Sequence, residues 1–168
     1  GRVELPPLLG KSTRILLAIS DDAVEPFHRR WRDSVGGDAR WIHFCGGRSF
    51  AGITRAHPLM TFNSNLYELS VYRRIPFVLD KGGPPFSSIL PALDNPAYEL
   101  SVEHMALYHA WAVLAGSATA TTWREYRRVA CEIFDLPESA LHPYLEQVGK
   151  NSLDLENPLT GPFARADE

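Results

Sequence analysis

The chain has 168 residues, of which 45% are hydrophobic and 22% are charged, a composition typical of folded globular proteins and not of disordered ones. Its 17 basic and 20 acidic residues give a net charge of −3, which argues against nucleic-acid binding. No apolar run approaches the roughly 20 residues that cross a bilayer, so no transmembrane segment is expected. Cys45 and Cys131 lie far apart in the sequence, which excludes a disulfide scaffold and a four-cysteine zinc site.

Apolar runs and helical patterns alternate through the first 80 residues. Strands are expected at 14–20, 40–45, 59–62 and 75–79, and helices at about 21–35, 48–57 and 65–73. This alternation predicts an α/β fold with a Rossmann-like parallel sheet of about four to five strands.

A helical C-terminal segment is expected to follow this sheet. After a loop that runs from Asp80 to about Pro96, helices are predicted at 102–114, 123–134 and 139–148. The first of these is apolar nearly all round and is therefore expected to be buried. The predicted organisation is a linker or tail at 1–13, the Rossmann-like domain with its C-terminal helices at 14–150, and a tail at 151–168.

Small polar residues mark the turn between the predicted strand 59–62 and the helix after it. Asn63 and Ser64 lie in this turn, and Glu68 follows one helical turn later. Backbone N–H groups at the helix start, with the Ser64 hydroxyl, would bind an anion, while Glu68 could reach a sugar hydroxyl. A helix cap with Glu68 completing a capping box is the alternative.

This segment resembles the donor-binding C-terminal half of GT-B glycosyltransferases, most closely the capsule and lipopolysaccharide group that includes the Kdo transferases. Ser64, Glu68 and the apolar strand 75–79 match in kind and order, and the strand 15–22 resembles the first strand of that half. The resemblance implies a nucleotide-sugar donor, with its phosphate over Ser64 and its ribose against Glu68. It implies a cytoplasmic enzyme half that acts in bacterial surface polysaccharide synthesis.

The same resemblance implies that neither a metal nor another cofactor is bound, so positive side chains would neutralise the leaving group. The candidate cations are Arg48, Arg55, Arg73 and Lys81. The predicted ligand-binding residues are Asn63, Ser64, Glu68, Arg48, Arg73 and Lys81, and no catalytic residue is identified. The base that activates the acceptor would come from a second domain or a partner protein. Because the chain begins with Gly1 rather than Met, a fragment of a longer enzyme is expected.

Two other functions stay open. A non-catalytic Rossmann-like module that binds a partner protein or regulates a larger enzyme would need no acid/base pair, and none is visible. A small hydrolase or nucleotide-processing enzyme would use His57 or His43. His43 and Cys45 share a strand face and could bind a metal together, but core packing is the preferred interpretation. Gly46-Gly47, directly after the second strand, would let a ligand approach the backbone closely.

Overall fold

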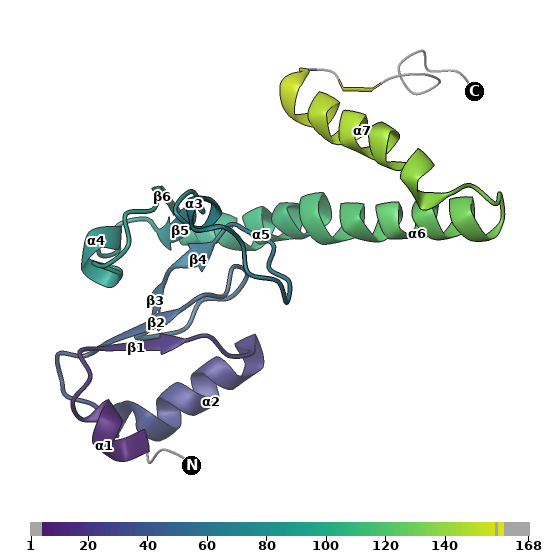
Figure 1. The fold of residues 1–168 in the computed structure, drawn as a ribbon. Coiled ribbons are helices and arrows are strands. Elements are labelled where there is room, and N and C mark those ends of the chain that lie inside the picture. Colours follow the sequence, from purple (N-terminus) through teal and green to yellow (C-terminus); the bar gives the residue numbers. More distant parts are fainter. Residues whose placement is uncertain (1–4, 157, 160–168) are drawn as a thin grey trace. The chain divides into compact units, whose positions relative to one another are not determined.

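The computed structural model describes residues 5–156 and 158–159. The chain divides into two compact units, Gly1–Val113 and Leu114–Glu168. Each unit has its own secondary structure, shown in Figure 1.

Two three-stranded sheets form the centre of the first unit (Figure 1). The first sheet is parallel and has the order β1-β2-β3; the second has the order β4-β5-β6, in which β5 is antiparallel to β4 and parallel to β6. The strands are β1 (Arg14–Leu17), β2 (Arg40–His43), β3 (Thr54–Arg55), β4 (His57–Pro58), β5 (Phe77–Asp80) and β6 (Ala97–Leu100).

The predicted α/β fold with a parallel sheet is thereby confirmed, but the strands are shared between two sheets. Between β3 and β4 stands Ala56, fully buried, whose backbone N–H donates to the His43 carbonyl at 2.9 Å. This one residue takes the chain from one sheet to the next. The parallel sheet therefore has three strands, slightly fewer than expected.

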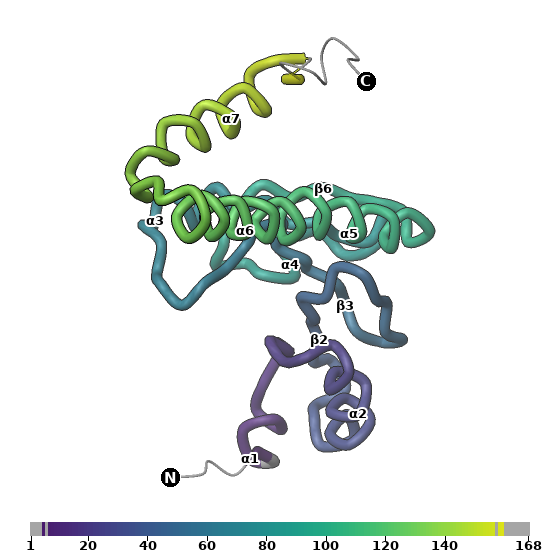
Figure 2. The backbone as a smooth tube through the Cα atoms, turned by 90° about the vertical axis from the view of Figure 1, so that its right-hand side faces the viewer, coloured from purple at the N-terminus to yellow at the C-terminus, as the bar shows by residue number. Residues whose placement is uncertain are grey.

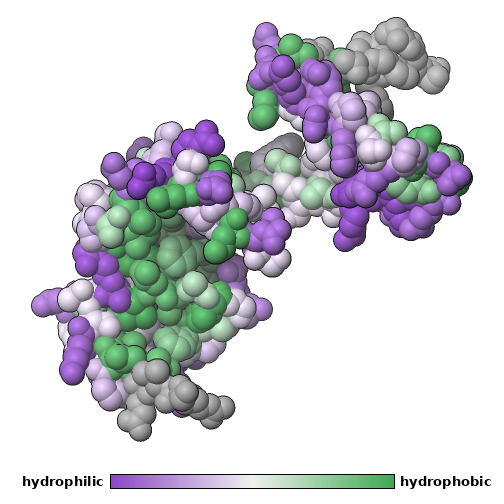
Figure 3. Space-filling view, viewed as in Figure 1, coloured by the Kyte–Doolittle hydropathy of each residue, from purple (hydrophilic) through white to green (hydrophobic). Residues whose placement is uncertain are grey.

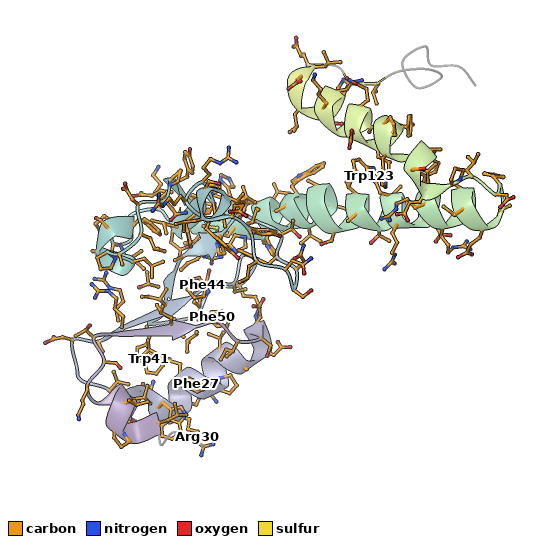
Figure 4. All side chains as sticks on the ribbon, in the orientation of Figure 1. Phe27, Arg30, Trp41, Phe44, Phe50 and Trp123 are labelled. Atoms are coloured by element: carbon orange, nitrogen blue, oxygen red, sulfur yellow. The ribbon has the colours of Figure 1, made fainter. Side chains whose placement is uncertain are left out.

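The helices of the first unit are short except for the second one. They are α1 (Leu5–Leu9), α2 (Asp21–Trp31), α3 (Leu69–Tyr72), α4 (Phe86–Ile89) and α5 (Met105–Val113), with 3₁₀ turns at Arg32–Ser34 and Val102–His104. Helix α2 covers one face of the first sheet (Figure 1, Figure 2). Figure 4 shows Phe27 of α2 pointing towards Trp41 of β2, and the two ring centroids are 6.3 Å apart.

Two buried clusters hold the first unit together. Residues of β1, β2 and α2 form one of them, in which Ile15, Leu17 and Val24 are buried. In the other, Ile42 of β2 packs with β5 and α4. Burial alternates along β1: Ile15 and Leu17 are buried on one face of the strand, and the residues between them are exposed on the other.

Several predicted elements differ from the observed ones. Residues 48–57, expected to be helical, turn at Gly52, which has a φ of 75°, and then form β3 and β4. The strand predicted at 59–62 is wrong, because the short strand in this region is His57–Pro58. The helix predicted at 65–73 shrinks to α3. Strand β6 lies between the predicted loop, which ended at about Pro96, and the helix predicted from 102, where no strand was expected.

Helices are the only regular secondary structure among the described residues of the second unit. It contains a π-helical turn (Leu114–Ala118), α6 (Thr119–Glu132), a 3₁₀ turn (Glu138–Ala140) and α7 (His142–Asp154). Trp123 of α6 packs against Gly149 of α7, where an added Cβ would lie 3.6 Å from the indole (Figure 4). Among the described residues, no helix is long and apolar enough to span a membrane. The predicted helical C-terminal segment is confirmed.

Candidate functional site

The carboxyl ends of β1 and β2 lie at the same edge of the parallel sheet, where wound α/β domains bind their ligands. The loop of residues 44–49, hereafter the β2 loop, begins at this edge. Its Cys45 thiol donates a hydrogen bond to Asp21 Oδ2 at 2.8 Å, which ties the loop to the first residue of α2. Burial raises the pKa of the Cys45 thiol, and the hydrogen bond to the Asp21 side chain raises it further. Cys45 is therefore protonated at pH 7 and acts here as a hydrogen-bond donor.

Arg55 of β3 lies beneath the β2 loop with its side chain fully buried. Its Nε donates to Asp80 Oδ1 of β5 at 3.0 Å, and its Nη2 donates to Ser49 Oγ at 2.6 Å. Its Nη1 donates to the Gly46 carbonyl at 2.6 Å. One guanidinium thus connects the β2 loop with strands of both sheets.

Two imidazoles and a phenol pack above the β2 loop. His57, which opens β4, has its ring centroid 5.5 Å from that of His109 and 5.8 Å from that of Tyr108, both on α5. His57 Nδ1 lies 2.9 Å from the Phe44 carbonyl oxygen. Since a carbonyl only accepts hydrogen bonds, Nδ1 carries the proton and Nε2 of the neutral ring is the free base.

The two imidazoles lie directly against Gly46 and Gly47 of the β2 loop. A Cβ at Gly46 would lie 2.3 Å from His109 Nδ1 and 2.8 Å from His57 Nε2, and a Cβ at Gly47 would lie 2.9 Å from His109 Cδ2. These separations are far below van der Waals contact, so only glycine lets the imidazoles rest on the backbone. We refer to His57, Tyr108 and His109 over Gly46 and Gly47 as the histidine site.

Burial also governs protonation here. Burial lowers the pKa of His57. The hydrogen bond to the Phe44 carbonyl raises it, and the charges of His109 and Arg55 lower it further. In the strand below, burial and then the Arg55 charge lower the pKa of His43 to about 4. Both imidazoles are therefore neutral at pH 7.

Some buried polar atoms of this region have no hydrogen-bond partner within the described part of the chain. They are Tyr108 Oη, His109 Nδ1 and both ring nitrogens of His43. Buried polar atoms are normally satisfied, so unpaired ones point to a ligand or to a structural cost. Tyr108 and His109 pack directly on His57, so two of these unpaired atoms belong to the histidine site.

The residues predicted from the glycosyltransferase resemblance lie elsewhere or at the edge of this site. Asn63, Ser64 and Glu68 are exposed in the loop before α3. That helix begins only at Leu69, and neither Ser64 nor Glu68 makes a side-chain cap bond. The helix start expected at Ser64, and with it the capping box, is therefore wrong. Asn63 Oδ1 accepts from the Asn65 backbone N–H at 2.7 Å, a local turn that competes with the helix.

The three cations among the predicted ligand-binding residues are also separated. Arg73 lines an open cavity of about 900 Å³ together with apolar residues such as Phe62 and Tyr72. Lys81 is exposed after β5. Arg48 lies on the β2 loop and forms an ion pair with Asp22, next to the partner of Cys45. Ligand binding by these residues stays a prediction.

Sequence reasoning missed the site's other members. Arg55, one of the candidate cations for the leaving group, is buried beneath the β2 loop. Tyr108 and His109 lie in the helix predicted at 102–114 and were not among the predicted ligand-binding residues. The available signal was Gly46-Gly47 directly after a strand, together with His57 as one of the few titratable groups close behind it.

No protein-family model matches the chain, and no curated protein matches it. Solved structures match it in fold. A Bacteroides fragilis protein named as a candidate NADP oxidoreductase aligns with a TM-score of 0.71 and 17% identity, over 95% of this chain and 67% of that one. A Thermotoga maritima protein, named without a function, aligns with a TM-score of 0.61 and 24% identity, over 92% of this chain and 64% of that one.

A third neighbour is a semialdehyde dehydrogenase NAD-binding protein of Cupriavidus necator, solved with calcium and NAD. It aligns with a TM-score of 0.58 and 17% identity, over 95% of this chain and 68% of that one. The fold is Rossmann-like. At these identities the likeness shows the fold alone.

The resemblance to GT-B glycosyltransferases is therefore wrong, and with it the donor-binding function in surface polysaccharide synthesis and the nucleotide-sugar partner. The solved neighbours include proteins named for NADP and NAD, and no family model supports a glycosyltransferase. The physical reason is that the matching motif depended on a helix starting at Ser64, and no helix starts there.

Proposed function

We propose that this chain forms the reacting end of the site in a nicotinamide-dinucleotide-dependent oxidoreductase. The observation that carries the proposal is the histidine site: His57, Tyr108 and His109 gather over Gly46 at the edge of the sheet where Rossmann-like domains bind ligands. The names of two of the solved neighbours support a dinucleotide as the cofactor.

The proposed roles follow from the protonation and hydrogen bonding of each group. When bound, the nicotinamide supplies hydride exchange with the substrate. His57 accepts or returns a proton at Nε2, since the Phe44 carbonyl fixes the proton on Nδ1 and the lowered pKa keeps the ring neutral. Tyr108 Oη and His109 Nδ1 orient an oxygen atom of the substrate. The substrate class is accordingly an alcohol or a carbonyl compound.

The pyrophosphate of such a cofactor would be held by residues outside this chain. Dinucleotide-binding domains hold it on a G-x-G-x-x-G turn, and the 168 residues contain no such motif. Asp21 and Asp22 open α2, and two carboxylates in the first turn of a helix disfavour phosphate there. A second domain or a partner protein is therefore part of the proposal.

Ligand titration tests the proposal. The probes are NADH, NADPH and reduced nicotinamide mononucleotide, with AMP and UDP as controls, and the readout is quenching of tryptophan fluorescence. Reduced nicotinamide mononucleotide contains the reacting end alone, so we expect it to bind where AMP and UDP do not. Failure of all three nicotinamide compounds to bind would show the proposal to be wrong.

A matched pair of variants locates the binding. Gly46→Ala places a methyl group against His109 and His57, whereas a Cβ at Gly37 meets no atom within 4 Å. We expect Gly46→Ala to weaken nicotinamide binding at least about tenfold, or about 1.4 kcal/mol, and Gly37→Ala to leave it unchanged. Equal affinities in the two variants would place the ligand away from the histidine site.

A non-catalytic interaction module is the second candidate, and exposed apolar surface favours it. Figure 3 shows hydrophobic residues gathered on one face of the first unit. Exposed apolar side chains of that unit include Leu16, Leu107 and Trp111, the last of which is 65% exposed. Large exposed apolar areas are typical of interaction sites. Self-association or partner binding without any nicotinamide binding would favour this function.

A further inference from the structure

Arg55 is the largest side chain that the described residues bury completely. A buried charge is costly unless it is paired and hydrogen-bonded, and a hydrophobic residue in its place is often no less stable. Arg55 is satisfied through its contacts: Asp80 Oδ1, the Gly46 carbonyl and Ser49 Oγ lie 2.6–3.0 Å from its nitrogens, and the Cys45 carbonyl lies at 3.4 Å.

Three of these four acceptors belong to the β2 loop. The fork of a guanidinium can hold several acceptors in fixed directions, which a lysine ammonium cannot do. Nη1 binds the carbonyl of Gly46, the residue on which His57 and His109 rest. The position of that carbonyl therefore sets how closely the two imidazoles approach the backbone.

We infer that Arg55 is a positioning residue. By bonding Gly46 and Ser49 of the β2 loop and Asp80 of β5 at the same time, it fixes the backbone against which His57 and His109 pack. The inference rests on the proposed function only in taking the histidine site to be the place where a substrate reacts. Its test needs no dinucleotide, so the two can fail separately.

Nuclear magnetic resonance of the imidazole groups in the whole chain provides that test. Signals of His57 and His109 are assigned by comparison with His57→Gln and His109→Gln. The charged and titratable groups around His57 are Arg55, His109 and Asp21, together with Tyr108, whose ring packs on it, and His43 in the strand below. Arg55→Lys keeps the positive charge and removes the fork, so a changed signal reports geometry rather than lost charge.

In Arg55→Lys we expect the close approach of His109 to Gly46 to be lost. As water reaches the loosened loop, the His57 titration midpoint should rise towards that of an unperturbed imidazole. A folded Arg55→Lys protein with unchanged contacts and an unchanged His57 midpoint would overturn the inference.

A milder variant decides the question if Arg55→Lys does not fold. Ser49→Ala removes only the acceptor of Nη2 on an exposed residue, and Ser87→Ala, an exposed serine of α4, is the matched control. We expect Ser49→Ala to shift the His57 and His109 signals and Ser87→Ala to leave them unchanged. Unchanged signals in both variants would overturn the inference, and Tm separates these effects from general destabilisation.

Discussion

The β2 loop and the loop of residues 59–68 both follow a short strand, and they differ in where their hydrogen bonds go. In the β2 loop, Cys45 bonds Asp21, and the carbonyl of Gly46 bonds Arg55. In the 59–68 loop, Asn65 bonds Asn63 and the Tyr67 hydroxyl bonds the Thr61 carbonyl. The first loop joins distant elements, whereas the second bonds mainly to itself.

This difference has a physical consequence. Residues 61–66 are all exposed, and Leu66 is 90% exposed. A substitution there therefore disturbs few packed neighbours. Cys45 and Gly46 are buried, and a change there disturbs α2, β3 and α5 together. A site needs groups held in a fixed geometry, which the β2 loop provides.

The largest expected effect comes from removing the partner of Arg55. Asp80→Ala leaves a fully buried guanidinium without its carboxylate, so we expect the free energy of unfolding to fall by about 3 kcal/mol. Glu25→Ala, which breaks the exposed pair with Arg29 on α2, should cost about 0.5 kcal/mol or less. Urea denaturation measures both, and equal losses would contradict the role given to Arg55.

The next effect is a loss of stability in acid that centres on His43, in the strand below the β2 loop. Its folded pKa of about 4 lies below the unfolded value of 6.5, so the unfolded state takes up a proton first. The contribution of neutral His43 to the free energy of unfolding is complete above pH 6.5. It is lost as the pH falls towards 4, and the loss amounts to about 3 kcal/mol at most.

Urea denaturation of the parent and of His43→Leu between pH 7 and 4.5 measures this contribution. The variant should show a flatter dependence on pH, with the remainder due to groups such as His57. Identical slopes would mean that His43 is not held neutral in the folded protein.

A smaller loss is expected for Gly46→Ala. The new methyl group must displace His109 or His57, and such overpacking costs about 1 to 3 kcal/mol. Gly37→Ala adds its methyl group in open space and should stay within about 0.5 kcal/mol of the parent. Thermal unfolding followed by circular dichroism compares the two, and a mild Gly46→Ala would mean that the imidazoles move away freely.

The smallest effects belong to the 59–68 loop. Ser64→Ala and Glu68→Gln should each change the free energy of unfolding by less than about 0.5 kcal/mol, because neither side chain caps α3. Nicotinamide binding should also stay unchanged. A loss of nucleotide affinity in either variant would restore the ligand-binding role predicted for these residues and would weaken the contrast between the two loops.

The sequence by itself determined the elements whose signals are local. The apolar runs that became β1, β2 and β5 and the helical period of α2 predicted an α/β fold, because side-chain spacing directly reflects strand and helix geometry. The helical C-terminal segment followed from the same reasoning. Gly46-Gly47 was also visible as a turn at a strand end.

The tertiary structure alone decided which of these turns carries a site. His57 and His109 meet over Gly46 because β4 and α5 pack there, and no local pattern encodes a contact between such distant positions. Burial of Arg55 likewise depends on Asp80 and the β2 loop arriving from elsewhere in the chain. At Ser64 the local pattern predicted a helix start that does not form. Asn63 and Asn65 form a turn there instead, and the helix begins only at Leu69. Local spacing fixes an element, whereas the environment of a side chain is set by what packs against it.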